Sequence, residues 1–266
     1  MTSSRDRARG GRTRRLPRPR LGPAPGTAVF LLLLAATTIV FALSDDRARA
    51  ELLLSSSTNL DHLSARPLLV LVASAFWTPG SAFLVWALAL VGISAPVERR
   101  LGTRRWLVVF AAGHVGATLL SLAGVAAAIR LGTVDPGVSN ATDVGVSYGM
   151  GAIIAVFLLG LPPRVGRPIL VALFLGLLGF LVVGRTFTDY GHLFAVSIGC
   201  ALWWHGIARP ARSADPGRAE RAHRRGGRLA LVELVAIALV VVVSALFQQS
   251  PSPAHGSPPA ATATLR

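Results

Sequence analysis

Ser147 and His192 are the residues of this sequence whose types could carry out nucleophilic chemistry together. Ser147 lies near the start of an apolar segment at 145–161, and His192 lies near the start of another at 188–206. If both segments are membrane helices running in the same direction, a rise of about 1.5 Å per residue places the two side chains at similar depth. A serine beside a histidine can act as a nucleophile with its general base. Small residues around both side chains are also typical of tight helix packing, so the two interpretations stay open.

The other polar residues of the apolar segments favour packing over chemistry. His114 lies midway along a segment at 106–128, and an interhelical hydrogen bond is the simplest interpretation of it. Cys200 is the single cysteine, so the chain can form no internal disulfide and has no Cys–His spacing typical of zinc. We therefore expect no metal and no organic cofactor.

The composition predicts a membrane protein with several helical spans. Hydrophobic residues make up 52% of the 266 residues, charged residues make up 15%, and the mean hydropathy is +0.58. Soluble domains carry about 25% charged residues, and disorder requires low hydrophobicity, so both classes are excluded. The chain contains no lysine, which excludes a retinal Schiff base. The apolar segments that approach the spanning length of about 20 residues are 26–43, 81–96, 106–128, 145–161, 168–183, 188–206 and 229–247.

Arginine is distributed unevenly between the two sides of these seven segments. With the N-terminus in the cytoplasm, the cytoplasmic side holds 21 arginines and the other side holds 6. This bias predicts a multi-pass protein of the cell membrane with a cytoplasmic N-terminus and an extracytoplasmic C-terminus. The Arg-rich arm at 1–26, predicted to be disordered, and the Arg-rich cytoplasmic loop at 207–228 are expected to contact anionic lipid headgroups rather than nucleic acid. Residues 248–266 predict a disordered tail.

The region around the first segment contains two further signals. Ala48-Arg49-Ala50 has the form of a signal-peptidase site, but the apolar run before it is longer than that of a signal peptide. We therefore predict that the first helix stays uncleaved. An apolar approach at 68–77, ended by a turn signal at 77–80, predicts a short interfacial helix before the second span.

Three stretches of the sequence resemble the rhomboid family of intramembrane serine proteases. Residues 97–102, Val-Glu-Arg-Arg-Leu-Gly, lie in the predicted cytoplasmic link where rhomboids carry a Glu-basic-basic-Leu-Gly stretch. Residues 145–147, Gly-Val-Ser, are similar to the family's G-x-S-G nucleophile motif, and residues 191–199, which begin Gly-His-Leu-Phe-Ala, are similar to its general-base helix. The resemblance covers about residues 27–206 and is strongest to the rhomboid-like proteins of actinobacteria.

The resemblance implies an all-α polytopic membrane protein, with a rhomboid-like six-helix bundle at 27–206 and a seventh C-terminal transmembrane helix at 229–247. It implies that Ser147 is the nucleophile, that His192 is the general base, and that the partner is a transmembrane protein substrate or client. The expected supporting residues are Gly145, Tyr148 and Asp189.

The sequence departs from the family at the residues that hold the oxyanion. Rhomboid proteases carry an H-x-x-x-x-H-x-x-x-N pattern on the second span, and an ungapped count places Trp77, Ala82 and Trp86 there. Tyr148 replaces the glycine that follows the nucleophile, and Gly151 stands where the family has a tyrosine that stacks on the base. The positions of the nucleophile and the base are therefore filled, while the side chains that stabilise the reaction are missing.

Three functions remain open from these observations. The missing oxyanion side chains favour a degenerate rhomboid that binds transmembrane clients. The filled positions of Ser147 and His192 keep an active rhomboid-type intramembrane serine endopeptidase as the alternative. A membrane protein that handles a lipid or small molecule, in which the two residues only pack, is the third.

Overall fold

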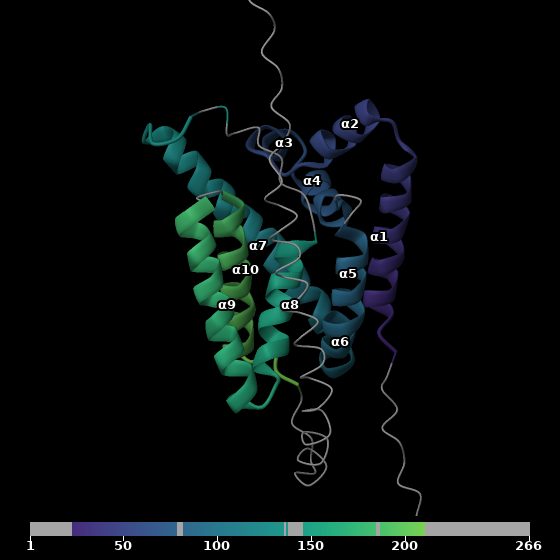
Figure 1. Ribbon diagram of the computed structural model, residues 1–266, viewed down its shortest axis with the longest axis vertical. Helices are drawn as coiled ribbons and strands as arrows, with labels where there is room; N and C mark the ends of the chain where they lie inside the picture. The colour runs from purple at the N-terminus through teal and green to yellow at the C-terminus, as the bar shows by residue number, and fades with distance from the viewer. Residues whose placement is uncertain (1–22, 79–81, 136, 138–145, 185–186, 211–266) are drawn as a thin grey trace, which may run out of the picture.

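All regular structure in the described residues is helical, as the sequence predicts. The structure is a computed structural model, and it describes residues 23–78, 82–135, 137, 146–184 and 187–210. Figure 1 shows an upright bundle with α1 at one side, α9 at the other, and the short helices α2, α3 and α4 across one end. The elements are α1 (Pro25–Leu43), α2 (Asp46–Ser56), α3 (Leu60–Ala65), α4 (Pro67–Ala73), η1 (Ser74–Phe76), α5 (Phe83–Ala89), π-helical η3 (Leu90–Ser94), α6 (Ala95–Leu101), α7 (Thr103–Arg130), α8 (Ser147–Leu159), α9 (Pro163–Gly184) and α10 (Phe187–Trp204).

Three helices of the described part are long and apolar enough to cross a membrane, namely α1, α7 and residues Pro163–Val183 of α9. They correspond to the predicted spans at 26–43, 106–128 and 168–183, and α7 and α9 extend beyond the predicted ends. The predicted seventh helix at 229–247, most of the arm at 1–26, most of the loop at 207–228 and the tail at 248–266 lie outside the described residues.

The predicted spans at 145–161 and 188–206 differ from expectation in length and polarity. Helix α8 has 13 residues, fewer than the about 20 that cross a bilayer. Ten of its residues are buried, because it runs through the interior of the bundle and contacts α7, α9 and α10. A helix covered by other helices need not match the thickness of the bilayer. Helix α10 has 18 residues, and Asp189 and His192 lower the hydropathy of its first turns.

The second predicted span, at 81–96, continues into the region that the sequence predicts as a cytoplasmic link. Elements α5, η3 and α6 form one helical run from residue 83 to residue 101, with a π-helical turn in the middle. Gly102 then adopts a φ of 82°, a left-handed conformation that glycine tolerates best, and α7 begins at Thr103. The link is therefore one residue long. The short helix predicted at 68–77 is present as α4 with η1, and its position at the membrane interface stays a prediction.

The segment at 44–66, which the sequence predicts as an extracytoplasmic link, contains α2 and α3. Both helices begin at a polar N-cap that accepts a backbone hydrogen bond. Asp45 accepts from Ala48 N at 2.8 Å, and Asn59 accepts from His62 N at 2.8 Å. Composition marks this segment as polar, but the caps are what allow such short helices to start.

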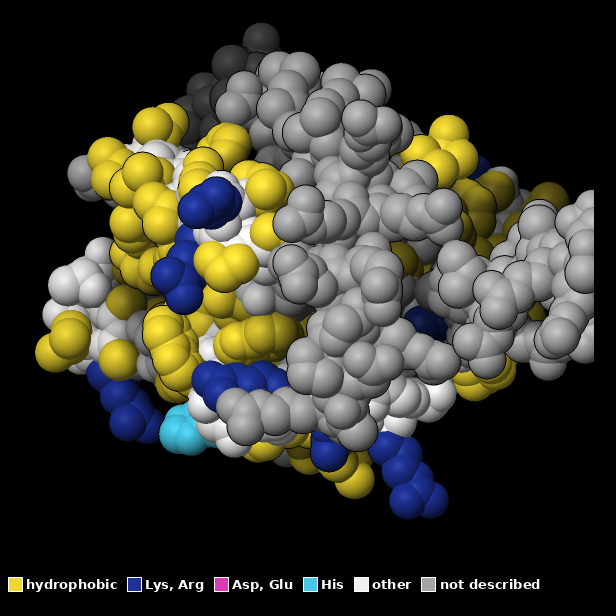
Figure 2. All heavy atoms as spheres, turned by 90° about the horizontal axis from the view of Figure 1, so that it is seen from below, with side chains coloured by type: hydrophobic (Ala, Val, Ile, Leu, Met, Phe, Trp, Pro, Cys, Tyr) yellow, Lys and Arg dark blue, Asp and Glu magenta, His cyan; other side chains and the backbone are white. Residues whose placement is uncertain are grey.

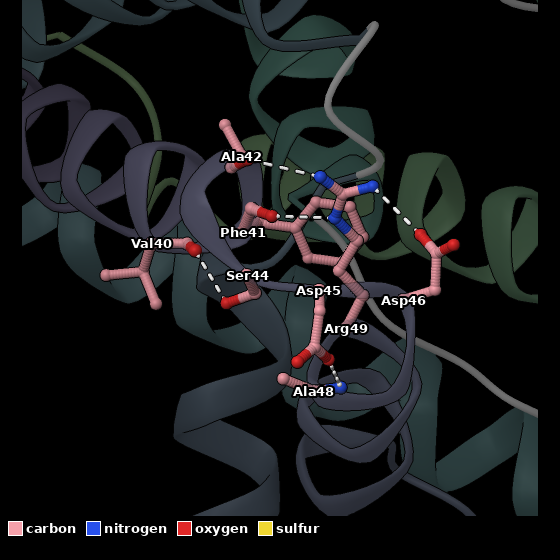
Figure 3. A network of polar contacts seen from close by, with 8 residues as sticks. All are labelled: Val40, Phe41, Ala42, Ser44, Asp45, Asp46, Ala48 and Arg49. Carbon is pink, nitrogen blue, oxygen red and sulfur yellow. Dashed lines mark hydrogen bonds and ion pairs between the residues drawn. The ribbon is translucent and has the colours of Figure 1, made fainter.

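Arg49 of α2 closes the C-terminal end of α1 (Figure 3). Its Nε donates to Phe41 O at 2.9 Å and its Nη2 donates to Ala42 O at 3.1 Å. Its Nη1 pairs with Asp46 at 3.2 Å, and its guanidinium lies 5.6 Å from the centroid of the Phe41 ring. The last carbonyls of a helix have no partner within the helix, so this cation satisfies two of them and ties α2 to the end of α1.

A buried carboxylate joins α1, α6 and α7 at the opposite end of the bundle. Glu98 is 1% exposed, and it accepts hydrogen bonds from Gly26 N at 2.8 Å, Thr27 N at 2.7 Å and Thr103 Oγ1 at 2.8 Å. The two N–H groups belong to the first turn of α1, which has no side-chain cap of its own. Burial raises the pKa of the Glu98 carboxyl, but the hydrogen bonds from Thr27, Thr103 and Gly26 outweigh burial and hold this pKa below its ordinary value.

Replacing Glu98 with glutamine should destabilise the fold, because the amide N–H₂ group then faces backbone N–H donors. We expect Glu98→Gln to lower the free energy of unfolding by about 2 kcal/mol, measured by thermal unfolding of the purified full-length protein in detergent. Because the folded-state pKa lies below the ordinary value of 4.5, the ionised carboxylate stabilises the fold above pH 4.5. This stabilisation is lost as the pH falls through the folded-state value, so the two proteins should converge in strongly acidic buffer.

Glu51→Gln is the control for this prediction. Its carboxylate pairs with Arg47 on the exposed surface of α2, so its removal should change the unfolding free energy by less than about 1 kcal/mol. Equal losses of stability in the Glu98 and Glu51 variants would contradict the structural role of Glu98.

Candidate functional site

Helices α8 and α10 run parallel and lie close together along their length. Tyr148 lies beside Gly191, Gly151 beside Ala195, and Gly199 beside Ala152. A Cβ on Gly151 would lie 3.1 Å from Ala195 Cβ, and a Cβ on Gly199 would collide with Ala152 O. The predicted packing of small residues is therefore confirmed. It is also what places the beginnings of the two helices, with Ser147 and His192, at the same end of the bundle.

Ser147 is the first residue of α8 and is half-buried. The preceding residue, Val146, is fully buried, so the start of the helix is anchored in the core. Gly145, the first residue of the predicted nucleophile motif, lies outside the described residues. Among the described residues, no hydrogen bond joins Ser147 Oγ to the ring of His192.

His192 lies in the second turn of α10 and is also half-buried. Its ring is held by a hydrogen bond with the backbone of Thr188, and the charge of Asp189 acts on it from one turn earlier. Asp189 lies one turn before His192 on the same helix.

Tyr148 is the side chain that contacts His192. It is 3% exposed, and its ring meets the imidazole edge-on with centroids 5.1 Å apart and planes 76° apart. Gly191 makes this contact possible, because a Cβ there would overlap the phenol end of Tyr148. Tyr148 also contacts Ala117 of α7 and Ala195 of α10, so it fills the space where three helices meet.

Comparison with known protein families identifies the family of this chain. A sequence model of rhomboid-like proteins matches residues 20–211, which is more than half of the chain. The chain belongs to the rhomboid-like protein family. Searches of curated proteins and of solved structures return no match. Family membership and the long apolar helices together make this chain a rhomboid-like membrane protein.

This rhomboid-like protein differs from the protease pattern at the start of α5. Ala82 is the residue immediately before the helix and carries no hydrogen-bond donor on its side chain. Trp86, one turn later, is partly buried and packs on the hydrophobic cluster that includes Phe30 and Phe110. Trp77, just after η1, is also partly buried. By the ungapped count along the sequence, these two indole rings and this methyl group correspond to the imidazole and amide groups of the family pattern.

A second Ser–His pair, which the sequence does not predict, lies between η1 and α7. His114 Nε2 is 3.1 Å from Ser74 Oγ and 3.0 Å from Leu71 O, and both side chains are buried. A carbonyl oxygen only accepts, so Nε2 carries the proton and cannot act as a base toward Ser74. The pair is therefore a structural link from α4 and η1 to α7, which confirms the interhelical interpretation of His114. The two residues are 40 positions apart, so only the folded chain brings them together.

The same face of α7 carries other buried polar groups. Thr118 and Ser121 follow His114 at positions four and seven residues later, and Thr78 lies just after η1. The hydroxyls of Thr78, Thr118 and Ser121 and the Nδ1 atom of His114 have no hydrogen-bond partner among the described residues. In the described part of the chain, no three His, Cys, Asp or Glu residues are placed to hold a metal ion.

The close approach of α8 and α10 predicts a sharp difference between two glycine substitutions. Gly199→Ala should push α10 away from α8, because the new Cβ would meet the backbone of Ala152, and we expect a loss of about 2 kcal/mol of unfolding free energy. Gly176→Ala in α9 is the matched control, since its Cβ would meet nothing within 4 Å. It should leave stability unchanged or raise it by up to about 1 kcal/mol.

Both variants are compared with the wild type by thermal unfolding in the same detergent. Equal effects of the Gly199 and Gly176 substitutions would show that α8 and α10 are not held at the spacing described above.

Proposed function

We propose that this rhomboid-like membrane protein binds transmembrane segments of other proteins without cleaving them. The observation that carries the proposal is that the Tyr148 ring contacts the His192 ring, while no hydrogen bond joins Ser147 Oγ to that ring among the described residues. A serine nucleophile needs its hydroxyl within hydrogen-bonding reach of its base. Here the ring of the adjacent Tyr148 lies against the imidazole, and it is buried too well to move aside without cost.

The side chains at the start of α5 support the same conclusion. Removing one oxyanion donor costs a serine protease about 2.7–4 kcal/mol, or 10²–10³ in rate. Ala82 offers no donor, and Trp86 offers only an indole N–H while its ring packs on the core. The loss of both donors leaves the backbone N–H groups at the start of α8 as the remaining donors near Ser147.

The second candidate function is an intramembrane serine endopeptidase. The parallel packing of α8 and α10 favours it, because it brings the start of α8 next to His192 and Asp189. In that mechanism Ser147 Oγ attacks a peptide carbonyl of a substrate helix, and His192 takes the hydroxyl proton and returns it to the leaving amine. Asp189 orients the imidazole and stabilises its charged form. Rotation of Tyr148 away from His192 would have to precede the first step.

Cleavage assays separate the two functions. Full-length protein in liposomes is mixed with single-span substrate proteins, and Ser147→Ala and His192→Ala serve as matched variants. We expect wild type and both variants to give the same background cleavage, and a serine-directed fluorophosphonate probe to leave Ser147 unlabelled. An active rhomboid protease tested on the same substrates shows that they can be cut. Cleavage by the wild type that disappears in both variants would establish the endopeptidase instead.

Client binding is measured in the same liposomes with a single-span peptide that carries a photoreactive residue. We expect saturable crosslinking that an unlabelled copy of the peptide competes away and that Ser147→Ala leaves unchanged, because Ser147 has no chemical role in binding. Crosslinking that does not saturate at any peptide concentration would contradict the binding function, whatever the cleavage assay shows.

A gain-of-function variant tests why the site is inactive. We expect Ala82→His with Trp86→Asn and Tyr148→Gly to restore two oxyanion side chains and uncover His192. Ser147, which is expected to be unlabelled in the wild type, should then react with the fluorophosphonate probe, because each oxyanion donor contributes about 10²–10³ in rate. The control adds Ser147→Ala to the same three changes and should remove the label. If labelling stays at the wild-type level in a folded triple variant, residues other than Ala82, Trp86 and Tyr148 keep Ser147 unreactive.

A further inference from the structure

One end of the bundle carries a group of arginines, which we call the arginine face. Every member is exposed, and together they come from α6, from the first turns of α7 and α9, and from the residues after α10. The face consists of Arg99, Arg100, Arg104, Arg105, Arg164, Arg167 and Arg209. His205 and Trp204 lie at the same end, and Trp204 is 73% exposed.

No exposed acidic residue of the described part balances these charges. The described acids other than Glu98 lie in α2, in α3, after α7 and at the start of α10, away from the arginine face. Glu98 is near the face but is buried, and its oxygens are taken by Gly26, Thr27 and Thr103. Figure 2 looks onto this end, where dark blue arginine side chains are visible and no magenta acidic side chain is.

Only some arginines of the arginine face contact other residues of the described chain. The Arg100 guanidinium lies 6.0 Å from the centroid of the Phe157 ring, and Arg105 Nη1 donates to Arg209 O at 3.2 Å. The ion pairs of the described residues are both in α2, at the other end of the molecule. Arg104, Arg164 and Arg167 have no partner among the described residues.

The helix dipoles do not explain why the arginines of this face lie where they do. Arg99 and Arg100 are in the last turn of α6, where a cation is favoured by the carbonyl end of the helix. Arg104, Arg105 and Arg164, in contrast, lie in the first turns of α7 and α9, where a cation is disfavoured and where no acidic residue is present. A positive-inside bias explains how such residues orient a chain during insertion, but it does not supply a counter-charge in the folded protein.

We propose that the arginine face binds the headgroups of anionic phospholipids in the membrane leaflet that contacts it. The phosphodiester of a headgroup accepts two parallel hydrogen bonds from a guanidinium fork, and arginine matches this geometry better than lysine. The exposed Trp204 lies at the same end, and tryptophan is enriched at the level of the headgroups. The lipid therefore supplies the negative charge that the described chain lacks here. All seven arginines of this site belong to the described part of the chain.

Quenching of tryptophan fluorescence by brominated lipid tests the proposal. Full-length protein in dodecyl maltoside micelles is titrated with brominated phosphatidylglycerol or with phosphatidylcholine brominated at the same acyl positions. We expect quenching at lower concentrations of phosphatidylglycerol than of phosphatidylcholine. The preference should fall by about fivefold for each important arginine removed, so the combined variant Arg104→Gln, Arg105→Gln, Arg164→Gln and Arg167→Gln should lose at least tenfold.

The matched control removes arginines from the other end of the bundle. The variant Arg47→Gln, Arg66→Gln and Arg130→Gln should keep the wild-type preference for phosphatidylglycerol. A charge-preserving variant, with lysine at the same four positions of the face, guards against misfolding of the glutamine variant. We expect it to unfold at the wild-type temperature and to keep at least half of the preference, because the charge remains.

Four results would overturn the proposal. The first is equal quenching of the wild type by the two lipids, and the second is an unchanged preference in the folded glutamine variant. The third is a loss of preference in the lysine variant despite wild-type stability. The fourth is competition by inorganic phosphate as effective as that of phosphatidylglycerol, which would assign the face to a free anion.

Discussion

The arrangement of the bundle depends on the hydrogen bonds that the buried Glu98 carboxylate accepts. It accepts from the first N–H groups of α1 and from Thr103 at the start of α7, while its own backbone belongs to α6. In an apolar environment an unpaired carboxylate or N–H group is costly, so each partner holds the other in place. With α1 anchored there, Phe30 packs against Phe76 and Phe110 and extends the core toward the other end of the molecule.

Small residues set the second constraint, the distance between α8 and α10. Without a hydrophobic driving force between helices in lipid, close backbone approach is what stabilises their contact. Gly151 and Gly199 permit that approach, and Gly191 leaves room for the ring of Tyr148. The same close packing decides which side chains meet at the candidate site. It brings the start of α8 to His192, but it also presses the phenol of Tyr148 against the imidazole.

The arginine side chains at the two ends of the bundle differ in whether acidic side chains pair with them. At the end with α2, arginine and acidic side chains pair with one another, and Arg49 also satisfies the last carbonyls of α1. At the arginine face, the one nearby acid is buried and its oxygens are occupied, so no described acid neutralises the exposed cations. This asymmetry agrees in direction with the arginine bias of the sequence. The orientation of the chain in the membrane stays a prediction.

The sequence alone determined the class of the molecule and the positions of its main helices. Long apolar runs can satisfy their backbone only as helices in a membrane, so α1, α7 and α9 were predictable from composition and length. The Glu-Arg-Arg-Leu-Gly stretch at 98–102 and the positions of Ser147 and His192 indicated the family that the comparison then showed. The small residues of α8 and α10 likewise predicted a close contact between the two helices.

Only the tertiary structure decided which side chains meet. Tyr148 and His192 are 44 positions apart, Ser74 and His114 are 40 apart, and Glu98 and Thr27 are 71 apart, and no local pattern encodes such pairs. The short helices α2 and α3 were missed because their polar residues resemble a loop until Asp45 and Asn59 act as caps. Periodicity reports which face of a helix is apolar, whereas the rotation of one helix against another, set by packing, determines which groups can react.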